Sequence, residues 1–303
     1  INIKKIARFG IVSLALGLAT LFTARTIFKF TLDPTYTKDQ IVSNRSTFQT
    51  PPPSTLYSSR ADQRAYSKHF PLLSQIKKRG ILRVGYSPNR LPYTYLNAAG
   101  DLVGLDVDLA YTLAHELGVK IEFVPITFDA LGKDLKTNYC DIVMSGLIVS
   151  TDFALEVALS TPYSHETMAF LVRDYNKEKF SSMAAIRKLK NPRLGIGDNA
   201  YYKDVVQDLF PHAQMVTVDS YSNQIAAGAP ELDALVYTAE SGSALSLLYP
   251  HFTVAIPYPK ILKVPVSFGV SPSEPEMIEF INTWIQLKKM TKQFNSFQLL
   301  DSG

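Results

Sequence analysis

Apolar and polar positions divide the chain into three parts. Residues 9–28 are mostly apolar and make a run long enough to cross a membrane as a helix. Polar residues and three prolines at 51–53 dominate the next stretch, a composition that cannot bury much apolar surface. The pattern predicts a transmembrane helix with a basic flank over 1–32, a polar linker over 33–70 and a globular domain over 71–303.

The globular part alternates between short apolar runs and segments with helical spacing. The apolar runs predict strands at 81–86, 119–124, 141–145, 168–172, 193–196, 215–218, 234–237, 253–257 and 264–270. The helical segments lie at 71–78, 128–135, 151–158, 183–189, 200–209, 241–248 and 274–289. A further helix is predicted to begin with Asp106 as its N-cap and to extend to Leu117. Alternation of this kind predicts an α/β fold rich in parallel strands.

Composition and charge exclude several classes of function. Hydrophobic residues make up 46% of the 303 positions and charged residues 19%, which is ordinary for a globular protein. The net charge of +4 is too small and too dispersed to indicate a nucleic-acid partner. The five histidines are scattered singly, so we expect no metal site and no cofactor. The one cysteine, Cys140, lies in an apolar run and is expected to be a buried, inert thiol.

The flanks of the N-terminal apolar run indicate its orientation. Lys4, Lys5 and Arg8 precede the run, which favours a cytoplasmic N-terminus and a globular domain in the periplasm or extracellular space. Arg25 and Lys29 on the other flank act against that orientation. A cleaved signal peptide is the alternative, but the run is long for one and no small-x-small cleavage site follows it.

A series of short motifs lies between residues 80 and 172. In chain order they are LRVG at 82–85, PY at 92–93, GLDVDLA at 104–110, LGV at 117–119, CDIVMSG at 140–146 and STPY at 160–163. In this order and spacing they resemble the extracytoplasmic solute-binding proteins, family 3, that serve amino-acid transporters. The rest of the chain follows the resemblance more loosely.

The resemblance implies a two-lobed clamp of the periplasmic-binding-protein-like type II fold, closing on its ligand about two crossing strands. Lobe one would comprise 80–172 and 265–303, and lobe two 173–264, with crossings near 172–174 and 263–266. The N-terminal segment also resembles the junction of proteins in which a cation:dicarboxylate symporter precedes such a domain. An independent membrane anchor explains the same residues.

The resemblance also implies where a ligand binds, at Arg90, Tyr93, Phe128, Ser145, Gly146, Asp198, Tyr201 and Glu240. Phe128 would form an aromatic wall, and Ser145 and Gly146 would bind a carboxylate. Asp198 and Glu240 would face the ligand from lobe two. Each has a plain structural alternative: Phe128 as helix core, and the two acids as helix caps.

Two positions depart from the family's pattern. Phe153 stands where the family usually has the arginine that holds the ligand carboxylate. Arg90 stands where the family has an aromatic residue before the motif at 92–93. Three interpretations remain open: Arg90 supplies the missing charge from the opposite wall, Arg90 is a surface loop residue, or the cleft no longer binds a ligand.

These patterns predict capture of an amino acid or dicarboxylate for a membrane transporter, in another protein or in the same polypeptide. A sensory ligand-binding domain is one alternative. A dehydratase-like enzyme on the same fold is another, and His165 with Glu166 is the only pair to test for it. We expect no catalytic residues and no enzyme activity.

Overall fold

The structure is a computed structural model that describes residues 42–45, 52–60, 70–197, 200–259 and 261–290. The predicted transmembrane helix over 1–32 and the predicted ligand residue Asp198 lie outside the described residues. Among the helices within the described ranges, none is long and apolar enough to span a membrane. Residues Val42–Gly303 form one compact unit, and the description that follows concerns that unit.

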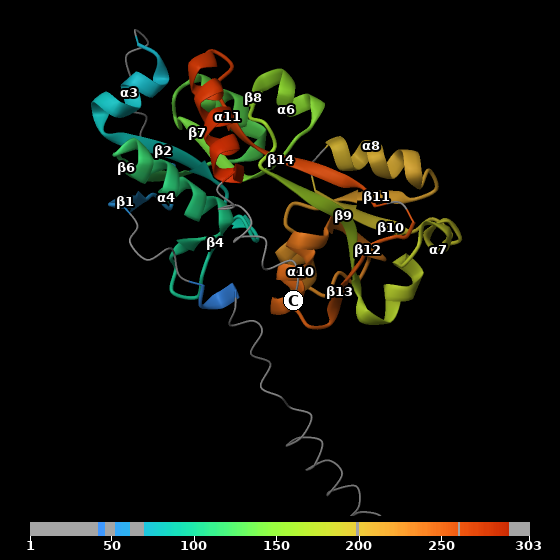
Figure 1. The fold of residues 1–303 in the computed structure, drawn as a ribbon. Coiled ribbons are helices and arrows are strands. Elements are labelled where there is room, and N and C mark those ends of the chain that lie inside the picture. The colour runs from blue at the N-terminus through green and yellow to red at the C-terminus, as the bar shows by residue number, and fades with distance from the viewer. Residues whose placement is uncertain (1–41, 46–51, 61–69, 198–199, 260, 291–303) are drawn as a thin grey trace, which may run out of the picture. The chain divides into compact units, whose positions relative to one another are not determined.

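Lobe one contains the first strands of the chain and the last helix (Figure 1). Its strands are β1 (Ser54–Leu56), β2 (Ile81–Tyr86), β3 (Asn89–Arg90), β4 (Thr94–Leu96), β5 (Leu102–Val103), β6 (Lys120–Pro125), β7 (Ile142–Ile148), β8 (Ala158–Leu159) and part of β14 (Lys263–Val270). Its helices are α3 (Leu72–Arg79), α4 (Leu105–Leu117), the 3₁₀ helix η1 (Phe128–Ala130), α5 (Leu131–Lys136), α6 (Thr151–Glu156) and α11 (Pro275–Met290).

Lobe two contains the middle of the chain. Its strands are part of β9 (Ser164–Arg173), β10 (Arg193–Ile196), β11 (Gln214–Thr217), β12 (Ala234–Thr238) and β13 (Phe252–Ala255). Its helices are the 3₁₀ helix η2 (Asp174–Phe180), α7 (Met183–Arg187), α8 (Ala200–Leu209), α9 (Tyr221–Ala226) and α10 (Ala239–Leu248). The segments η2 and α9 were not predicted from the sequence.

One eleven-stranded sheet runs through both lobes, in the order β1-β6-β2-β7-β14-β9-β12-β10-β11, with β8 on β14 and β13 on β9. Neighbouring strands are parallel from β1 to β7 and from β12 to β11, as the α/β pattern predicts. The strands β3, β4 and β5 form a separate three-stranded antiparallel sheet.

The lobes are joined by β9 and β14, which pair in antiparallel fashion at the crossing. Residues Ser164–Thr167 pair with Lys263–Val266, whereas the later residues of β9 pair with β12 and β13 in lobe two. The second crossing therefore lies where it was predicted. The first crossing lies earlier than the predicted 172–174, because those residues already belong to the sheet of lobe two.

Local chemistry sets the ends of several elements. Gly80 ends α3 at φ 69° and Gly118 ends α4 at φ 68°, the left-handed conformation that glycine adopts without steric cost. Side chains of Ser150, Ser182 and Thr238 accept backbone N–H groups at the first turns of α6, α7 and α10.

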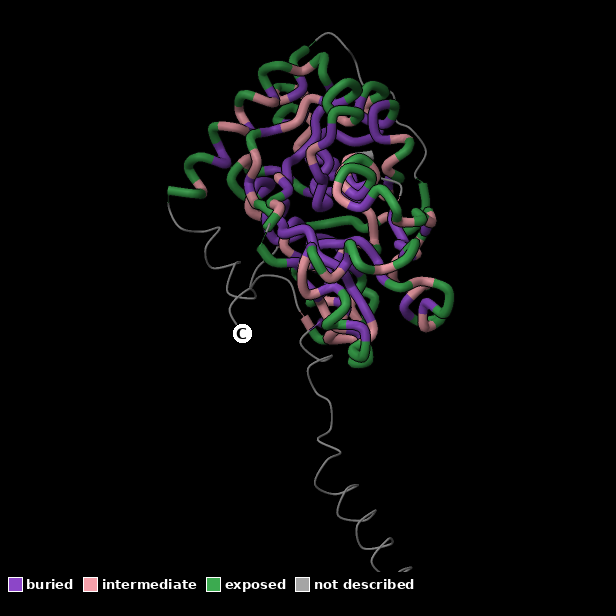
Figure 2. Tube along the Cα trace, turned by 90° about the vertical axis from the view of Figure 1, so that its right-hand side faces the viewer, coloured by how far each residue is buried: buried purple, intermediate pink, exposed green. Residues whose placement is uncertain are grey.

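Each lobe has its own apolar core. Figure 2 shows the buried segments gathered in the interior, with exposed segments mostly at the periphery. In lobe one, Leu82 of β2, Phe268 of β14 and Trp284 of α11 share a core cluster. In lobe two, Phe170 and Phe210 pack edge to face with ring centroids 5.8 Å apart. Burial of α11 against lobe one agrees with the apolar spacing that predicted this helix.

Two segments of the predicted linker pack on lobe one, and we call residues 42–45 and 52–60 together the strap. The sequence indicated little order here, but β1 adds to the sheet in parallel beside β6, and Val42 is buried. Edge strands need only backbone partners and a modest apolar contact, so a polar composition does not prevent pairing. The linker is therefore, in its described parts, a component of lobe one.

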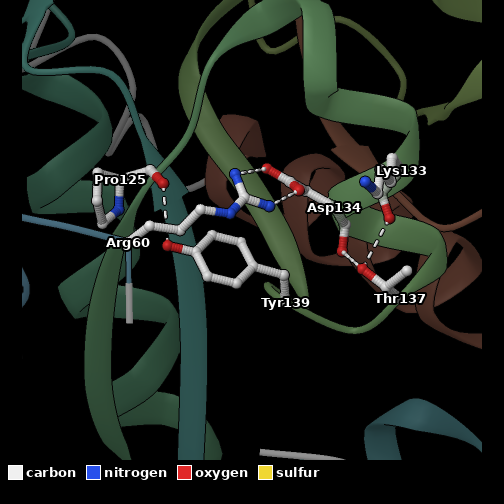
Figure 3. A network of polar contacts seen from close by, with 6 residues as sticks. All are labelled: Arg60, Pro125, Lys133, Asp134, Thr137 and Tyr139. Carbon is white, nitrogen blue, oxygen red and sulfur yellow. Dashed lines mark hydrogen bonds and ion pairs between the residues drawn. The ribbon is translucent and has the colours of Figure 1, made fainter. Parts of the chain in front are cut away.

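The strap is also held by charged side chains. Arg45 Nη2 lies 2.8 Å from Asp108 Oδ2 of α4. Arg60 donates two hydrogen bonds to the Asp134 carboxylate, and its guanidinium lies 4.3 Å from the centre of the Tyr139 ring (Figure 3). Asp134 is fully buried, so Arg60 supplies the charge that its carboxylate needs.

Candidate functional site

A cavity of about 750 Å³ is lined by residues of both lobes. Its volume falls in the range of small-molecule sites, which is roughly 300–1,000 Å³. Lobe one contributes Arg90, Phe128 and Phe153, and lobe two contributes aromatic side chains at 202, 221 and 237. The Phe128 and Phe153 ring centroids are 6.3 Å apart, so these two rings form one apolar wall. Charged side chains also line the cavity, at Arg90, Asp129, Asp152, Lys203 and Asp219. A cavity with aromatic walls and charged groups suits a small solute with a polar or charged head.

Arg90 brings a positive charge to this cavity. It ends β3, and its Nε and Nη2 donate to the Gly146 carbonyl at 3.3 and 3.0 Å. The guanidinium carbon also lies 5.9 Å from the centre of the Phe128 ring. Burial lowers the pKa of Arg90, but the neighbouring Tyr237 and Glu166 outweigh that effect and raise the pKa above its usual value. Arg90 is half-buried and lines the cavity, which is the placement that a role in ligand binding requires.

Gly146 lies where lobe one leaves no room for a side chain. It adopts φ 60° within β7, and a Cβ at this position would lie 2.4 Å from the Tyr93 ring. Its N–H donates to Asp106 Oδ2 at 2.6 Å, and the other Asp106 oxygen accepts from the Tyr163 hydroxyl at 2.7 Å. Burial raises the pKa of Asp106 to about 7, although these two hydrogen bonds oppose the rise. Asp106 thus positions the strand rather than capping α4, whose N-cap is Gly104.

Tyr93 and Ser145 lie behind the cavity wall and do not line it. The Ser145 hydroxyl accepts from the Ser87 N–H at 2.9 Å and lies 2.7 Å from the Thr94 hydroxyl. It therefore holds the loop that carries Arg90. Tyr93 is buried against Gly146 and packs edge to face with Tyr163.

The predicted residues of lobe two are placed differently from one another. Glu240 Oε2 accepts the Thr167 N–H at 2.7 Å at the lobe crossing and does not line the cavity. Tyr201 does not line it either, whereas its neighbour Tyr202 does. Arg90, Phe128 and Gly146 are thus the predicted residues that the structure brings together at the cavity.

The comparisons with known proteins place this site in a family. The bacterial extracellular solute-binding proteins, family 3, match residues 82–298. The chain belongs to that family.

Individual curated proteins resemble the chain over about half of its length or less. Arginine-binding protein 1 of an ABC transporter from Escherichia coli strain K12 is 28% identical over 142 residues, covering 47% of this chain and 56% of the relative. Cyclohexadienyl dehydratase from Pseudomonas aeruginosa is 29% identical over 114 residues, covering 38% of this chain and 42% of the enzyme. The chain thus spans about half the length of the curated relatives it matches.

Solved structures confirm the predicted two-lobed fold. An ancestral amino acid-binding protein, a precursor of cyclohexadienyl dehydratase, superposes with a TM-score of 0.66 at 27% identity, covering 75% of this chain and 97% of its own. An amino acid ABC transporter substrate-binding protein from Streptococcus pneumoniae, bound to L-arginine, has a TM-score of 0.65. At 21% identity, over 74% of this chain and 95% of its own, it supports the fold alone.

Glu166 lies near the cavity but was not predicted as a ligand contact. Glu166 of β9 is fully buried, and its Oε1 accepts hydroxyl hydrogen bonds from Thr238 at 3.0 Å and Ser241 at 2.9 Å. Burial raises its pKa, Arg90 lowers it and Glu240 raises it further. Strand periodicity could have indicated that Glu166 is buried, since it lies on the same face of β9 as Met168 and the other core residues of that strand.

No metal is indicated in the part of the chain that the structure describes, where no three His, Cys, Asp or Glu side chains converge.

Proposed function

We propose that this chain captures a small polar solute, an amino acid or a dicarboxylate, outside the cytoplasm and delivers it to a membrane transporter. The observation that carries the proposal is the cavity lined by both lobes, with the Arg90 guanidinium beside the Gly146 carbonyl and the Phe128 ring. Family membership supports solute capture, and relatives are named for binding arginine, cystine and histidine.

Arg90 is the group we assign to the acidic end of the solute. Phe153 lines the cavity in place of the family's usual arginine, so the ligand carboxylate needs another cation. Arg90 and Lys203 are the two cations that line the cavity, and both are half-buried. Arg90 is the one that lies beside the Phe128 ring and the Gly146 carbonyl. Phe128 would then pack against the body of the solute.

The membrane part of the proposal rests on sequence alone. A span within 1–32 would tether the capture domain, and the partner would be a separate transporter or a cation:dicarboxylate symporter in the same polypeptide. Tethering would keep captured solute near the transporter, which raises its effective concentration there.

A thermal-shift screen tests the proposal with the purified chain. Acidic, neutral and cationic amino acids and C4 dicarboxylates are added singly, and a ligand at a hundred times its Kd should stabilise the fold by about 2.7 kcal/mol. Phe128→Ala should reduce the shift, whereas Phe70→Ala, an exposed aromatic outside the cavity, should retain it. No shift with any compound would contradict solute capture.

A dehydratase-like enzyme is the second candidate, because cyclohexadienyl dehydratase is among the relatives. Glu166 and Asp106 are buried acids with raised pKa values near the cavity, a property of general acids. Neither of them lines the cavity, however, so neither can reach a bound solute in this arrangement. The geometry therefore supports binding better than catalysis.

A further inference from the structure

Two phenylalanine side chains of lobe one present apolar surface to the cavity. Phe128 of η1 and Phe153 of α6 both line it, and both are half-buried. Their ring centroids are 6.3 Å apart and the ring planes are inclined by 46°, so the two rings form one aromatic surface. Apolar surface left open in a concave site is typical of a place where a ligand buries an apolar group of its own.

Two tyrosine side chains of lobe two line the same cavity. The rings of Tyr221 and Tyr237 stack with their centroids 4.2 Å apart. The Tyr221 hydroxyl accepts a hydrogen bond from the Gly197 N–H at 2.7 Å and donates one to the Val236 carbonyl at 2.8 Å. The hydroxyl is thus engaged within lobe two, so it is the ring that Tyr221 offers to a ligand. Because these bonds also fix the ring, binding against it costs little side-chain entropy.

An acid group on the same ligand would find its partner beside the phenylalanines. The Arg90 guanidinium carbon lies 5.9 Å from the centre of the Phe128 ring. Its hydrogen bonds to the Gly146 carbonyl use two of the five N–H groups of a guanidinium, so Arg90 can also donate to a solute carboxylate. Water and salt screen the charges of the exposed aspartates that also line the cavity, Asp129, Asp152 and Asp219.

We propose that the solute is an aromatic acid, with its ring between the phenylalanines of lobe one and the tyrosines of lobe two and its carboxylate at Arg90. Aromatic amino acids and aryl-substituted carboxylates belong to this class. The inference rests on the proposed function, since it names the class of solute that the same cavity takes. Aromatic rings attract one another beyond the effect of apolar burial, because ring edges are positive and ring faces negative. A saturated ring of similar size lacks that attraction.

Paired ligands separate an aromatic site from one that is only apolar. L-phenylalanine is compared with L-cyclohexylalanine, and phenylacetate with cyclohexylacetate, by isothermal titration calorimetry at constant ionic strength. Within each pair the charge is equal and the size is similar, and the cyclohexyl compound is the more hydrophobic. We expect the unaltered chain to bind the phenyl member at least about fivefold more tightly than its cyclohexyl counterpart in at least one pair.

Removing one ring from the cavity wall should reduce this preference. Phe153→Leu keeps an apolar side chain in the cavity without the ring, so the preference for the phenyl compound should fall by at least about twofold. Phe70→Leu makes the same replacement at an exposed aromatic residue outside the cavity and should retain the full preference. If Phe153→Leu does not unfold cooperatively, Phe128→Leu is subject to the same criteria.

Three results would overturn the inference. They are cyclohexyl compounds that bind as tightly as their phenyl counterparts in both pairs, a preference that is unchanged in the folded variant, and binding of an acyclic amino acid or dicarboxylate by a chain that binds neither phenyl compound. The third result would leave solute capture intact. If no compound binds at all, both the inference and solute capture are contradicted.

Discussion

Gly146 combines two constraints that a larger residue cannot meet. Its φ of 60° is unfavourable for other residues, and a Cβ would lie 2.4 Å from the Tyr93 ring. Gly100 has a similar φ of 85° but open space around it. Comparing substitutions at Gly146 and Gly100 therefore separates the cost of backbone strain from the cost of steric conflict with Tyr93.

We expect Gly146→Ala to lower the free energy of unfolding by about 2–4 kcal/mol, the sum of backbone strain and overpacking. Gly100→Ala should cost about 1–2 kcal/mol, because only the left-handed conformation opposes it. Urea unfolding of both variants measures the difference. Equal losses would show that Tyr93 moves aside without cost.

Asp106 should make stability depend on pH. Burial raises its pKa from 3.8 to about 7, so between these values the folded state keeps a proton that the unfolded state releases. Its contribution to stability is therefore complete below pH 3.8 and is lost as the pH rises to about 7. Neighbouring Arg90 lowers the pKa of Asp106, and Glu166 raises it.

Comparison with Asp106→Asn isolates this effect from Glu166, whose pKa is also raised. From pH 4.5 to 7, the stability of the unaltered chain should fall relative to the variant by up to about 1.4 kcal/mol per pH unit. Chemical denaturation across the pH range provides the two curves. Parallel curves would mean that Asp106 is ionised in the folded protein throughout.

At the scale of the element, one contact of the strap joins a half-exposed arginine, Arg60, to the buried acid Asp134. Arg60→Ala would leave the Asp134 carboxylate without its cation (Figure 3). We expect a loss of about 1–2 kcal/mol, less than for a fully buried pair because water screens Arg60. Arg193→Ala breaks an exposed pair with Glu231 and should cost no more than about 0.5 kcal/mol. Similar losses in thermal unfolding would assign Arg60 a surface role only.

Elements flanked by glycine or proline are among those whose bounds were predicted correctly from the sequence. Gly80 precedes β2, and Pro192 and Gly197 enclose β10, so both strands match the predicted runs. Strand β9 begins four residues before the predicted run, because residues 164–167 are polar and their partner, β14, is about a hundred residues away. Long-range pairing of this kind leaves no local pattern.

The same limit applies to the candidate site. Gly146 lies in the motif at 140–146 and Arg90 just before the motif at 92–93, so short motifs mark both positions, whereas Phe128 was assigned from the family resemblance alone. Strand periodicity places Glu166 on the buried face of β9, but its place beside the cavity could not be predicted, since its partners are hydroxyls of β12 and α10 that only the fold brings near. Glu240 has the residue type expected of a ligand contact but lies at the lobe crossing instead.

For the whole molecule, the two crossing strands imply a hinge. A solute held by both walls of the cavity stabilises the arrangement in which the lobes approach each other. We expect any compound that gives a thermal shift to reduce the radius of gyration in small-angle X-ray scattering, and an inactive compound to leave it unchanged. An unchanged profile at saturation would mean that the lobes do not close on the solute.

Strand β1 has a consequence for the molecule in solution. It occupies the outer side of β6, pairing Ser54, Thr55 and Leu56 with Ile121, Glu122 and Phe123. Without it, β6 would present a row of unpaired N–H and C=O groups beside apolar side chains, a template for another chain to add to. The strap therefore protects the domain against self-association. A chain that begins at residue 67 lacks the strap and would be prone to aggregate, even if its ligand cavity is intact.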